Sequence, residues 1–292
     1  MLGTWRDCCA AEARVFAEGK VGRLENKTAI ITGGAGGIGK EAGRLFAAEG
    51  ANVLLVDRDE AAVKQAVEEI GGPRVASCVA DVTDAQSTRD YVRAAVDRFG
   101  GIDILVANAG IEGKVVPITE CDEDTFDRVI AVNVRGVWLG IKYAFPELIK
   151  RGGGSIVITS SVAGVRGAAR MAPYITSKHA VIGLMKTAAL EGAPHRIRVN
   201  TVNPSAVETR MMRSLEEGFM PGRARQMHDS MAASIPLQRY AEPADVAKLM
   251  LFLVSDDAAF LTGSVYMADG GSTARLAPPP VGPGGLVPAL HL

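Results

Sequence analysis

The sequence predicts an α/β fold: a doubly wound parallel seven-stranded sheet in a single domain. From residue 28 onward, short apolar runs rich in β-branched residues alternate with longer segments of helical periodicity. Each run is almost continuously apolar, as expected of strands that helices cover on both faces. This alternation requires crossover connections, which are right-handed and produce a parallel sheet.

The predicted elements follow one another in a regular order. The seven runs predicted to be strands are 28–32, 52–56, 74–80, 103–107, 155–160, 197–202 and 264–268. The six principal helices are predicted at 39–50, 59–70, 84–100, 122–150, 173–192 and 242–255. Together these elements account for residues 25–275 as one domain.

Two terminal segments fall outside this pattern. Residues 1–24 form an N-terminal extension, for which a short amphipathic helix and a loose segment both stay open. Residues 276–292 form a tail rich in Pro and Gly, with a polyproline II stretch favoured at 278–280. We expect the tail to lack regular structure, the alternative being that its end docks on a neighbouring subunit.

Composition and charge exclude several classes of function. The 292 residues are 48% hydrophobic and carry a formal net charge of −1, so nucleic acid and anionic membranes are not expected partners. No apolar run approaches the roughly 20 residues that cross a bilayer. Charges run through the N-terminus where a signal peptide needs an apolar stretch, and we expect a cytoplasmic protein.

The cysteines give no sign of a metal site. Cys8, Cys9, Cys78 and Cys121 lack the spacing of metal ligands, and two adjacent cysteines suit neither a simple disulfide nor a zinc site. We therefore expect free thiols and no bound metal.

A glycine-rich turn joins the first predicted strand to the first helix. It reads TGGAGGIG over residues 32–39, with Gly33, Gly36, Gly37 and Gly39 in the turn. Glycines let a pyrophosphate approach the helix N-terminus, where unpaired N–H groups and the helix dipole stabilise negative charge. Alone this is a weak signal, because glycines also serve tight turns that hold no ligand.

An acidic residue at the end of the second predicted strand favours a dinucleotide. The Asp57 carboxylate can accept hydrogen bonds from the adenosine ribose and would repel a 2′-phosphate. The alternative is that Asp57 caps the next helix, although Asp59 is also placed to do so. Gly34 brings no basic side chain into the turn, so NAD(H) is favoured, whereas Arg58 could tolerate the phosphate of NADP(H).

Six motifs, in order over residues 25–275, resemble the short-chain dehydrogenase/reductase family. They are TGGAGGIG, ADV (80–82), ANAG (107–110), AVNVRG (131–136), ITSSVAG (158–164) and YITSK (174–178). Two positions depart from the family pattern, which usually has Asn at Ala107 and Gly at Ser205. The resemblance implies a Rossmann-like fold and cofactor contacts from Ile38, Asp81, Val82, Asn108, Ala109, Gly110, Tyr174, Lys178, Pro204, Val207 and Thr209, in addition to the glycines, Asp57 and Arg58.

The pair Tyr174 and Lys178 could supply the base that alcohol oxidation requires. Residues four apart share a helix face, but this spacing is common by chance. Oxidation needs a base for the hydroxyl proton as hydride leaves, and a tyrosine near its usual pKa of about 10 is a poor base. A nearby ammonium lowers that pKa. We predict Tyr174 as the acid/base and Lys178 as the group that tunes it.

The resemblance implies two more catalytic residues, Ser161 and Asn133. The Ser161 hydroxyl would donate to the substrate oxygen. Ser160 is its competitor, but neighbours on an extended segment face opposite sides, which favours Ser161. Asn133 would anchor a water that links Lys178 to solvent. The alternative is an Asn at a helix kink, and the two can be true together.

The residues that would contact the substrate are less sharply defined by the sequence. Residues 207–231 lie where the family places a mobile lid, and they hold five adaptable methionines, Met211, Met212, Met220, Met227 and Met231. Ordinary helix core is the alternative for each of them. Small residues at 167–169 leave room beside Ser161 for a bulky or cyclic substrate. Arg210 and Arg213 could contact an acidic substrate, although a solvated face is favoured.

These features predict an NAD(H)-dependent oxidoreductase that transfers a hydride between nicotinamide and a secondary alcohol or ketone, hydrophobic or cyclic. A 3-oxoacyl-thioester reductase is the enzymatic alternative, and Asp57 argues against the NADPH that such enzymes usually prefer. An NAD(H)-sensing module without turnover is the alternative of another class, but it need not retain the Ser–Asn–Tyr–Lys set. The resemblance also implies a homotetramer built on two helix faces and the last strand.

Overall fold

The computed structural model describes residues 22–274. The tail predicted at 276–292, most of the extension predicted at 1–24, and the pair Cys8 and Cys9 lie outside the described residues. Leu24, which the sequence assigned to the extension, is 1% exposed and belongs to the core.

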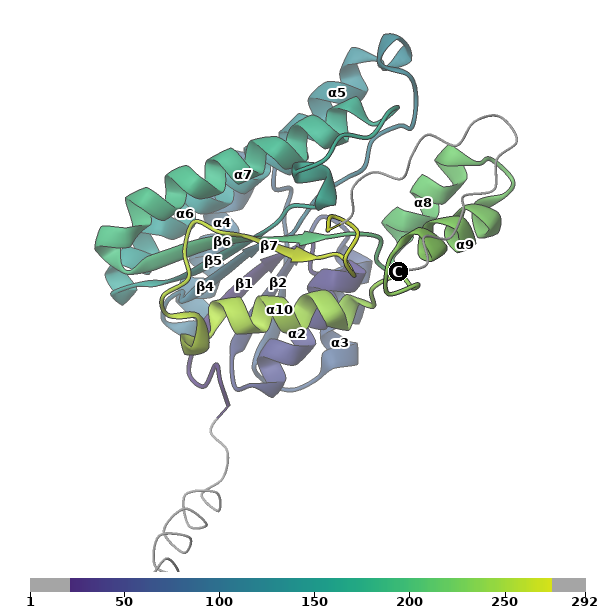
Figure 1. The fold of residues 1–292 in the computed structure, drawn as a ribbon. Coiled ribbons are helices and arrows are strands. Elements are labelled where there is room, and N and C mark those ends of the chain that lie inside the picture. The colour runs from purple at the N-terminus through teal and green to yellow at the C-terminus, as the bar shows by residue number, and fades with distance from the viewer. Residues whose placement is uncertain (1–21, 275–292) are drawn as a thin grey trace, which may run out of the picture.

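Seven parallel strands form one sheet in the order β3-β2-β1-β4-β5-β6-β7, which confirms the predicted fold class (Figure 1). The strands are β1 (Thr28–Thr32), β2 (Asn52–Asp57), β3 (Val75–Val79), β4 (Ile104–Ala107), β5 (Gly154–Thr159), β6 (Ile197–Pro204) and β7 (Val265–Ala268). The chain order reverses at β1, which pairs with β2 on one side and β4 on the other. Open α/β sheets bind ligands outside the carboxyl ends of the strands at such a reversal.

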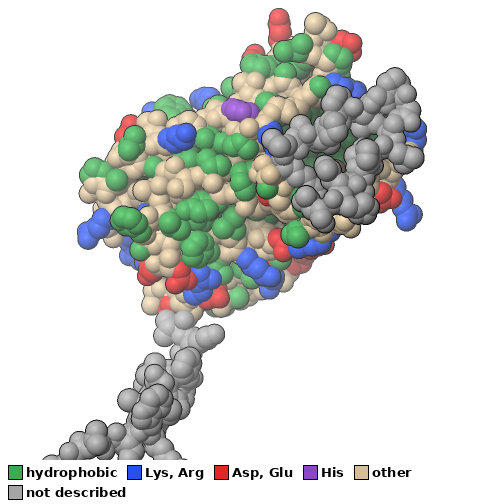
Figure 2. Space-filling view, viewed as in Figure 1, with side chains coloured by type: hydrophobic (Ala, Val, Ile, Leu, Met, Phe, Trp, Pro, Cys, Tyr) green, Lys and Arg blue, Asp and Glu red, His purple; other side chains and the backbone are tan. Residues whose placement is uncertain are grey.

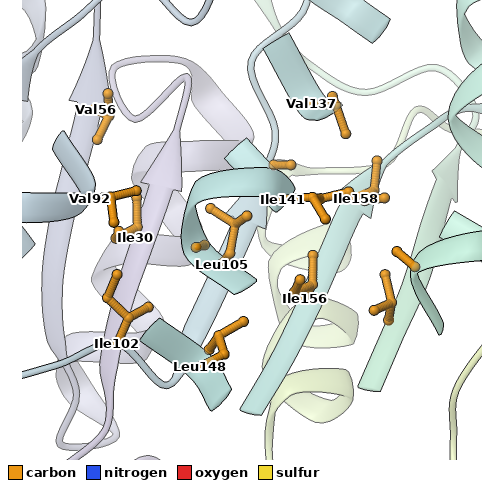
Figure 3. Close-up of a cluster of buried hydrophobic side chains, with 14 of the residues drawn as sticks. Ile30, Val56, Val92, Ile102, Leu105, Val137, Ile141, Leu148, Ile156 and Ile158 are labelled. Carbon is orange, nitrogen blue, oxygen red and sulfur yellow. The ribbon is translucent and has the colours of Figure 1, made fainter. Parts of the chain in front are cut away.

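Helices cover both faces of the sheet (Figure 1). One face packs against α2 (Gly37–Ala48), α3 (Glu60–Ile70) and α10 (Pro243–Val254), and the other against α4 (Ala85–Phe99), α6 (Gly136–Arg151) and α7 (Ala172–Gly192). Successive strand residues point to opposite faces. Ile30 therefore packs in the core beneath α4, α6 and α7, and its neighbour Ile31 packs in the core beneath α2, α3 and α10. Figure 3 shows Leu105 of β4 and Ile156 of β5 grouped with Ile141 of α6.

The two edge strands, β3 and β7, are less buried than the sequence predicted, since it predicted that helices cover every strand on both faces. The five inner strands are almost fully buried. In β3 only the first two residues are buried, and all four residues of β7 are half-buried. An edge strand has a neighbouring strand on one side only, so continuous apolar sequence does not ensure complete cover in the single chain.

The segment predicted as one helix at 122–150 is divided by a π-helical turn. It consists of α5 (Glu123–Ile130), the turn η2 (Ala131–Arg135) and α6. A π turn has a different period from an α-helix, so the apolar pattern of the sequence does not reveal it. Asn133 lies in this turn and is 1% exposed.

Two helices, α8 (Arg210–Phe219) and α9 (Ala224–Ser234), stand apart from the sheet layers (Figure 1). They fill the region where the sequence predicted a substrate lid. Within residues 22–274 no helix is long and apolar enough to cross a membrane. In the same range no cluster of His, Cys, Asp and Glu could hold a metal ion, and Cys78 and Cys121 are free.

Candidate active site

The candidate site residues converge at the carboxyl edge of the sheet. Gly33 follows β1, Asn108 follows β4, Ser161 lies just beyond β5, and Pro204 ends β6. These strands are neighbours in the sheet, so residues far apart in the sequence meet around the reversal between β1 and β4.

Tyr174 and Lys178 lie in the first turns of α7. Pro173 near the start of this helix fits there, because a proline lacks the N–H that would go unpaired in the first turn. Tyr174 is 9% exposed and Lys178 is 5% exposed. The Lys178 Nζ lies 5.5 Å from the centroid of the Tyr174 ring and donates to the main-chain oxygen of Thr159 at 2.8 Å. The ammonium is thus held between the tyrosine and the end of β5.

Burial governs both pKa values in the protein chain alone. It raises the pKa of Tyr174 to about 12, while a hydrogen bond with Ser161 acts in the opposite direction and the negative charge of Glu112 adds to the increase. Burial also lowers the pKa of Lys178 to about 8. The sequence predicted a pKa of Tyr174 lowered by Lys178, but in the chain itself desolvation of the phenolate is the largest effect and raises it.

The two adjacent serines point to different partners. Ser161 caps the short helix η3 (Val162–Gly164) by accepting from the Ala163 N–H at 3.1 Å, and its hydroxyl donates to the Pro204 oxygen at 3.3 Å. Ser160 is 2% exposed and donates to the main-chain oxygen of Lys178 at 3.0 Å. Ser161 is therefore the serine that interacts with Tyr174, whereas Ser160 holds the helix.

Asn133 ties three segments together. Its Oδ1 accepts from the Ile111 N–H at 2.8 Å, and its Nδ2 donates to the Ile111 oxygen at 2.9 Å and to the Ser177 hydroxyl at 3.0 Å. Gly110 lies beside both Asn133 and Lys178: a Cβ there would be 3.3 Å from the Asn133 Oδ1 and 3.6 Å from the Lys178 Nζ. Asn133 thus lies at a helix irregularity, with Gly110 close to both it and Lys178, while its role as the anchor of a water stays a prediction.

The glycine turn forms a backbone cradle. Gly33 has a left-handed φ of +66°, and a Cβ on Gly39 would lie 2.2 Å from the Gly33 oxygen. Helix α2 then begins at Gly37, and its N-cap Gly36 provides no side chain to bond the first N–H groups. Ile38 lies in this first turn and packs partly on the core. Open N–H groups and a close backbone fit the diphosphate of a dinucleotide.

Asp57 acts on the glycine turn and does not cap the next helix. Its Oδ2 accepts from the Ala35 N–H at 3.1 Å, which ties the end of β2 to the turn. Asp59 is the N-cap of α3 and accepts from the Ala62 N–H at 3.0 Å. This division removes the alternative that Asp57 is a helix cap. The neighbouring Arg58 is exposed.

The ADV and ANAG segments border the same edge. The exposed Asp81 accepts from both the N–H and the hydroxyl of Thr83 at 2.8 Å, and Val82 packs against Gly136 at the start of α6.

Asn108 donates to the Thr32 oxygen at 3.1 Å and accepts from Thr159 at 3.1 Å, so it joins β1 to β5. The Thr32 hydroxyl in turn accepts from the N–H groups of Asn108 and Ala109, a role that the sequence did not indicate.

Residues after β6 form the opposite wall. Val207 is 4% exposed and pairs with Ala241 in an isolated bridge. Thr209 caps α8 by accepting from the Met212 N–H at 3.4 Å, and its methyl group lies 3.3 Å from a Cβ built on Gly37. The cap of α8 thus borders the N-terminus of α2. The N–H of Ser205 donates to the Ala268 oxygen at 3.3 Å, so the family departure at this position is compatible with the sheet edge.

An apolar cluster covers Tyr174. We call it the Tyr174 cluster; its members are Ala163, Met171, Tyr174 and Leu215, with Val115, Ile175, Met211, Met212 and Phe219 packed against them. Two of the five lid methionines belong to it, whereas Met231 packs on a separate cluster around Tyr240. The sequence did not single out Val115, Leu215 or Phe219, because each is an unremarkable apolar residue until α8 folds over α7.

Glu208, just before α8, is the common partner of a charged residue of α8 and a histidine of α9. Arg213 forms an ion pair with Glu208 and lies 3.6 Å from Glu216, and the His228 Nε2 lies 2.9 Å from Glu208. The sequence assigned no role to His228, whose pKa is raised chiefly by its hydrogen bond with Glu208. These contacts hold α8 and α9 together.

Comparisons with known proteins agree with this geometry. The family model described as "Enoyl-(Acyl carrier protein) reductase" matches residues 33–273. Levodione reductase of Leifsonia aquatica is 36% identical over 86% of this chain and 96% of its own length. Cyclohexanol dehydrogenase of an Acinetobacter species is 36% identical over 87% of this chain and 97% of its own length.

Solved structures agree as well. The crystal structure of levodione reductase has a TM-score of 0.84 and covers 87% of this chain and 100% of its own. A 3-ketoacyl-(acyl-carrier-protein) reductase from Brucella melitensis, complexed with NADH, is 34% identical with a TM-score of 0.78, over 86% of this chain and 99% of its own.

The cradle can be tested by adding one methyl group. In Gly39→Ala the new Cβ would overlap the Gly33 oxygen, so the turn must shift, and we expect NADH affinity to fall about tenfold or more. Gly183→Ala is the matched control, since a Cβ there meets nothing within 4 Å. Fluorescence titration with NADH measures both variants, with a melting curve to verify folding. Equal affinity in the folded Gly39→Ala protein would contradict the cradle.

Proposed function

The chain belongs to the short-chain dehydrogenase/reductase family, and we propose that it is an NAD(H)-dependent oxidoreductase acting on a secondary alcohol or ketone that is hydrophobic or cyclic. The observation that carries this proposal is the contact of Tyr174 with Ser161 on one side and Lys178 on the other, beside the glycine turn. The names of the two relatives, a levodione reductase and a cyclohexanol dehydrogenase, support a cyclic substrate.

The chain's own residues manage the proton and the orientation of the substrate. When bound, the nicotinamide accepts or supplies the hydride. Tyr174 takes the hydroxyl proton during oxidation and returns it during reduction. Ser161 donates to the substrate oxygen and stabilises the charge that develops on it. The positive charge of Lys178 favours the phenolate form of Tyr174, and Asn133 fixes the backbone beside that ammonium.

The residues proposed to hold the dinucleotide come from three sides of the crevice. The glycine turn with Ile38 would hold the diphosphate, Asp57 and Arg58 the adenosine ribose, and Asp81 and Val82 the adenine. The remaining contacts, toward the nicotinamide half, would come from Asn108, Ala109, Gly110, Tyr174, Lys178, Pro204, Val207 and Thr209. Asp57 supports NAD(H), because its carboxylate would repel the 2′-phosphate of NADP(H).

Helix α8 packs over part of Tyr174. Tyr174 is 9% exposed and Leu215 of α8 belongs to its cluster, so a bound substrate would lie against this helix. Met211 and Met212 can repack around a bound molecule, because unbranched Met side chains adapt to irregular shapes. This supports a lid over an apolar substrate.

A 3-oxoacyl-thioester reductase is the second candidate. The similarity to the Brucella enzyme and the description of the matched family model favour it. Asp57 and the formal net charge of −1 favour the first candidate, because an acyl carrier protein is recognised by a basic surface. Rates with cyclohexanol and with an acetoacetyl thioester, each assayed with both dinucleotides, separate the two.

Assembly as a homotetramer in the cytoplasm is also part of the proposal. Figure 2 shows hydrophobic side chains gathered over the face formed by α7, β7 and α10. Half-buried and exposed residues of this face are Leu249, Phe252, Phe260, Leu261, Val265 and Tyr266, and Phe260 is 100% exposed. A contiguous apolar patch at a sheet edge supports contact with a second copy.

The acid/base role is tested by Tyr174→Phe. Removing the hydroxyl should lower kcat for cyclohexanol oxidation at least about 100-fold, because general acid–base catalysis contributes that much. NADH affinity should stay within about twofold. Tyr143→Phe is the control: the Tyr143 hydroxyl accepts from Arg89 on α4, away from the candidate site, so the activity of this variant should persist. An unaffected rate in Tyr174→Phe would remove the mechanism, and NADH binding without any turnover in the unaltered protein would favour a sensing module.

The pKa values of Tyr174 and Lys178 predict how the rate of alcohol oxidation changes with pH. Oxidation needs Tyr174 without its proton, and the raised pKa of about 12 makes that form scarce at neutral pH. Between about pH 6 and pH 7, where Lys178 with its pKa of about 8 is mostly protonated, kcat/KM for oxidation should rise up to about tenfold per pH unit. Reduction uses the protonated phenol and should not rise. A flat oxidation profile over this range would exclude Tyr174 as the titrating base.

Cofactor choice is tested by Asp57→Ser. Loss of the carboxylate should shift the ratio of kcat/KM for NAD+ over NADP+ toward NADP+ by about tenfold or more. Asp59→Ser is the matched control, because it alters only the cap of α3 and should leave the ratio unchanged. If the ratio stayed constant in Asp57→Ser, Asp57 would not select the cofactor.

A further inference from the structure

A carboxylate that the proposed mechanism does not use lies in a segment that borders Lys178 and Tyr174. In this segment a Cβ on Gly110 would be 3.6 Å from the Lys178 Nζ, and Val115 packs on the Tyr174 cluster. Glu112 follows Gly110 by two residues in the segment between β4 and α5, and it is half-buried. Its negative charge acts on Tyr174 and disfavours the phenolate that alcohol oxidation requires. Within residues 22–274 its carboxylate has no hydrogen bond or ion pair. Its oxygens are not among the buried, unpartnered side-chain atoms of residues 22–274, so a bound molecule can reach them and donate a hydrogen bond in place of water.

The backbone on both sides of Glu112 is fixed. Both main-chain groups of Ile111 bond to the side chain of Asn133. Gly113 has a left-handed φ of +74°, and a Cβ there would lie 2.9 Å from Val129, so the chain is held tightly against α5. Glu112 is therefore presented from a rigid support that Asn133 also links to α7 through Ser177.

The charged groups nearby are engaged elsewhere. On the same segment, the Lys114 Nζ lies 2.5 Å from Asp122. Before α7, the Arg170 guanidinium donates to the Val115 oxygen at 3.2 Å. On α7, the Lys178 ammonium donates to the Thr159 oxygen, and on α8 Arg213 pairs with Glu208 and Glu216. The Tyr174 cluster itself is apolar apart from the phenol, so its other side chains offer no donor to Glu112.

We propose that Glu112 is a specificity-determining residue that accepts a hydrogen bond from a second hydroxyl of the substrate. The substrate class is then cyclic diols and hydroxyketones, in preference to simple cyclic alcohols and to substrates that carry a carboxylate. This inference rests on the proposed function and deepens it. The apolar residues of the Tyr174 cluster would cover the ring, while Ser161 and Glu112 would bond its two oxygens.

Three probes and two variants test the inference. The probes are cyclohexanol, cyclohexane-1,2-diol and 4-hydroxycyclohexanecarboxylate, assayed for kcat/KM with NAD+. We expect the unaltered protein to prefer the diol over cyclohexanol. In Glu112→Gln that preference should fall about fivefold or more, because hydrogen bonds to a charged acceptor are roughly twice as strong as those to a neutral one. Activity on the carboxylate probe should rise by a similar factor, since the repulsion is gone.

The control variant is Glu120→Gln, which removes an exposed carboxylate from the same segment and should change none of the ratios. A second readout tests the placement of Glu112: its neutralisation should shift the pH profile of cyclohexanol oxidation toward lower pH. Opposite changes for the diol and the carboxylate probe cannot come from a general loss of folded enzyme.

Several outcomes would overturn the proposal. Equal changes for all three probes in Glu112→Gln would show that Glu112 acts on Tyr174 alone and does not contact the substrate. An unshifted pH profile would remove Glu112 from the neighbourhood of the phenol. If cyclohexanol is oxidised and the diol is not preferred, the substrate class is wrong while the proposed function stands. If the unaltered protein oxidises none of the probes with either dinucleotide, both fail.

Discussion

The hydrogen bonds of the Asn133 side chain join the three parts of the chain on which the site depends. They link the π turn between α5 and α6 to the Ile111 backbone and to Ser177 on α7. Each of these groups is buried or half-buried, so loss of the amide would leave unpaired polar groups, at about 1–3 kcal/mol for each. The same bonds hold the segment in which Gly110 lies close to Lys178 and in which Glu112 follows Ile111. The π turn that carries Asn133 thus fixes the positions of these three segments relative to one another.

Burial sets the charge state of the site before any ligand binds. It raises the pKa of Tyr174 and lowers that of Lys178, so both residues are driven toward their neutral forms. The Thr159 carbonyl orients the ammonium, and Ser161 partly offsets the burial of the phenol. In the proposed mechanism, proton transfer by Tyr174 would therefore depend on positive charge close to its ring, and the Lys178 ammonium lies 5.5 Å from the ring centroid.

The glycine turn and the lid impose a second constraint on the same edge. Gly37 at the start of α2 lies against Thr209, whose side chain caps α8. Because Leu215 of α8 also packs on Tyr174, one short segment borders both the proposed diphosphate cradle and the proposed acid/base residue. Movement of α8 would accordingly alter the surroundings of both the glycine turn and Tyr174. Glu208, just before α8, contacts Arg213 of α8 and His228 of α9 and so links the two helices.

The sequence by itself determined the seven strands, the glycine turn and the Tyr174–Lys178 spacing, because each depends on local chemistry such as apolar runs, glycine and one helical turn. Other features are contacts between residues distant in the chain, and only the tertiary structure decided them. It assigned the cap of α3 to Asp59 and left Asp57 to the glycine turn, turned Ser160 toward α7, and inserted the π turn at Asn133. It also brought Leu215 over Tyr174 and the charge of Glu112 near its phenol, since long-range packing and desolvation leave no periodic trace in a sequence.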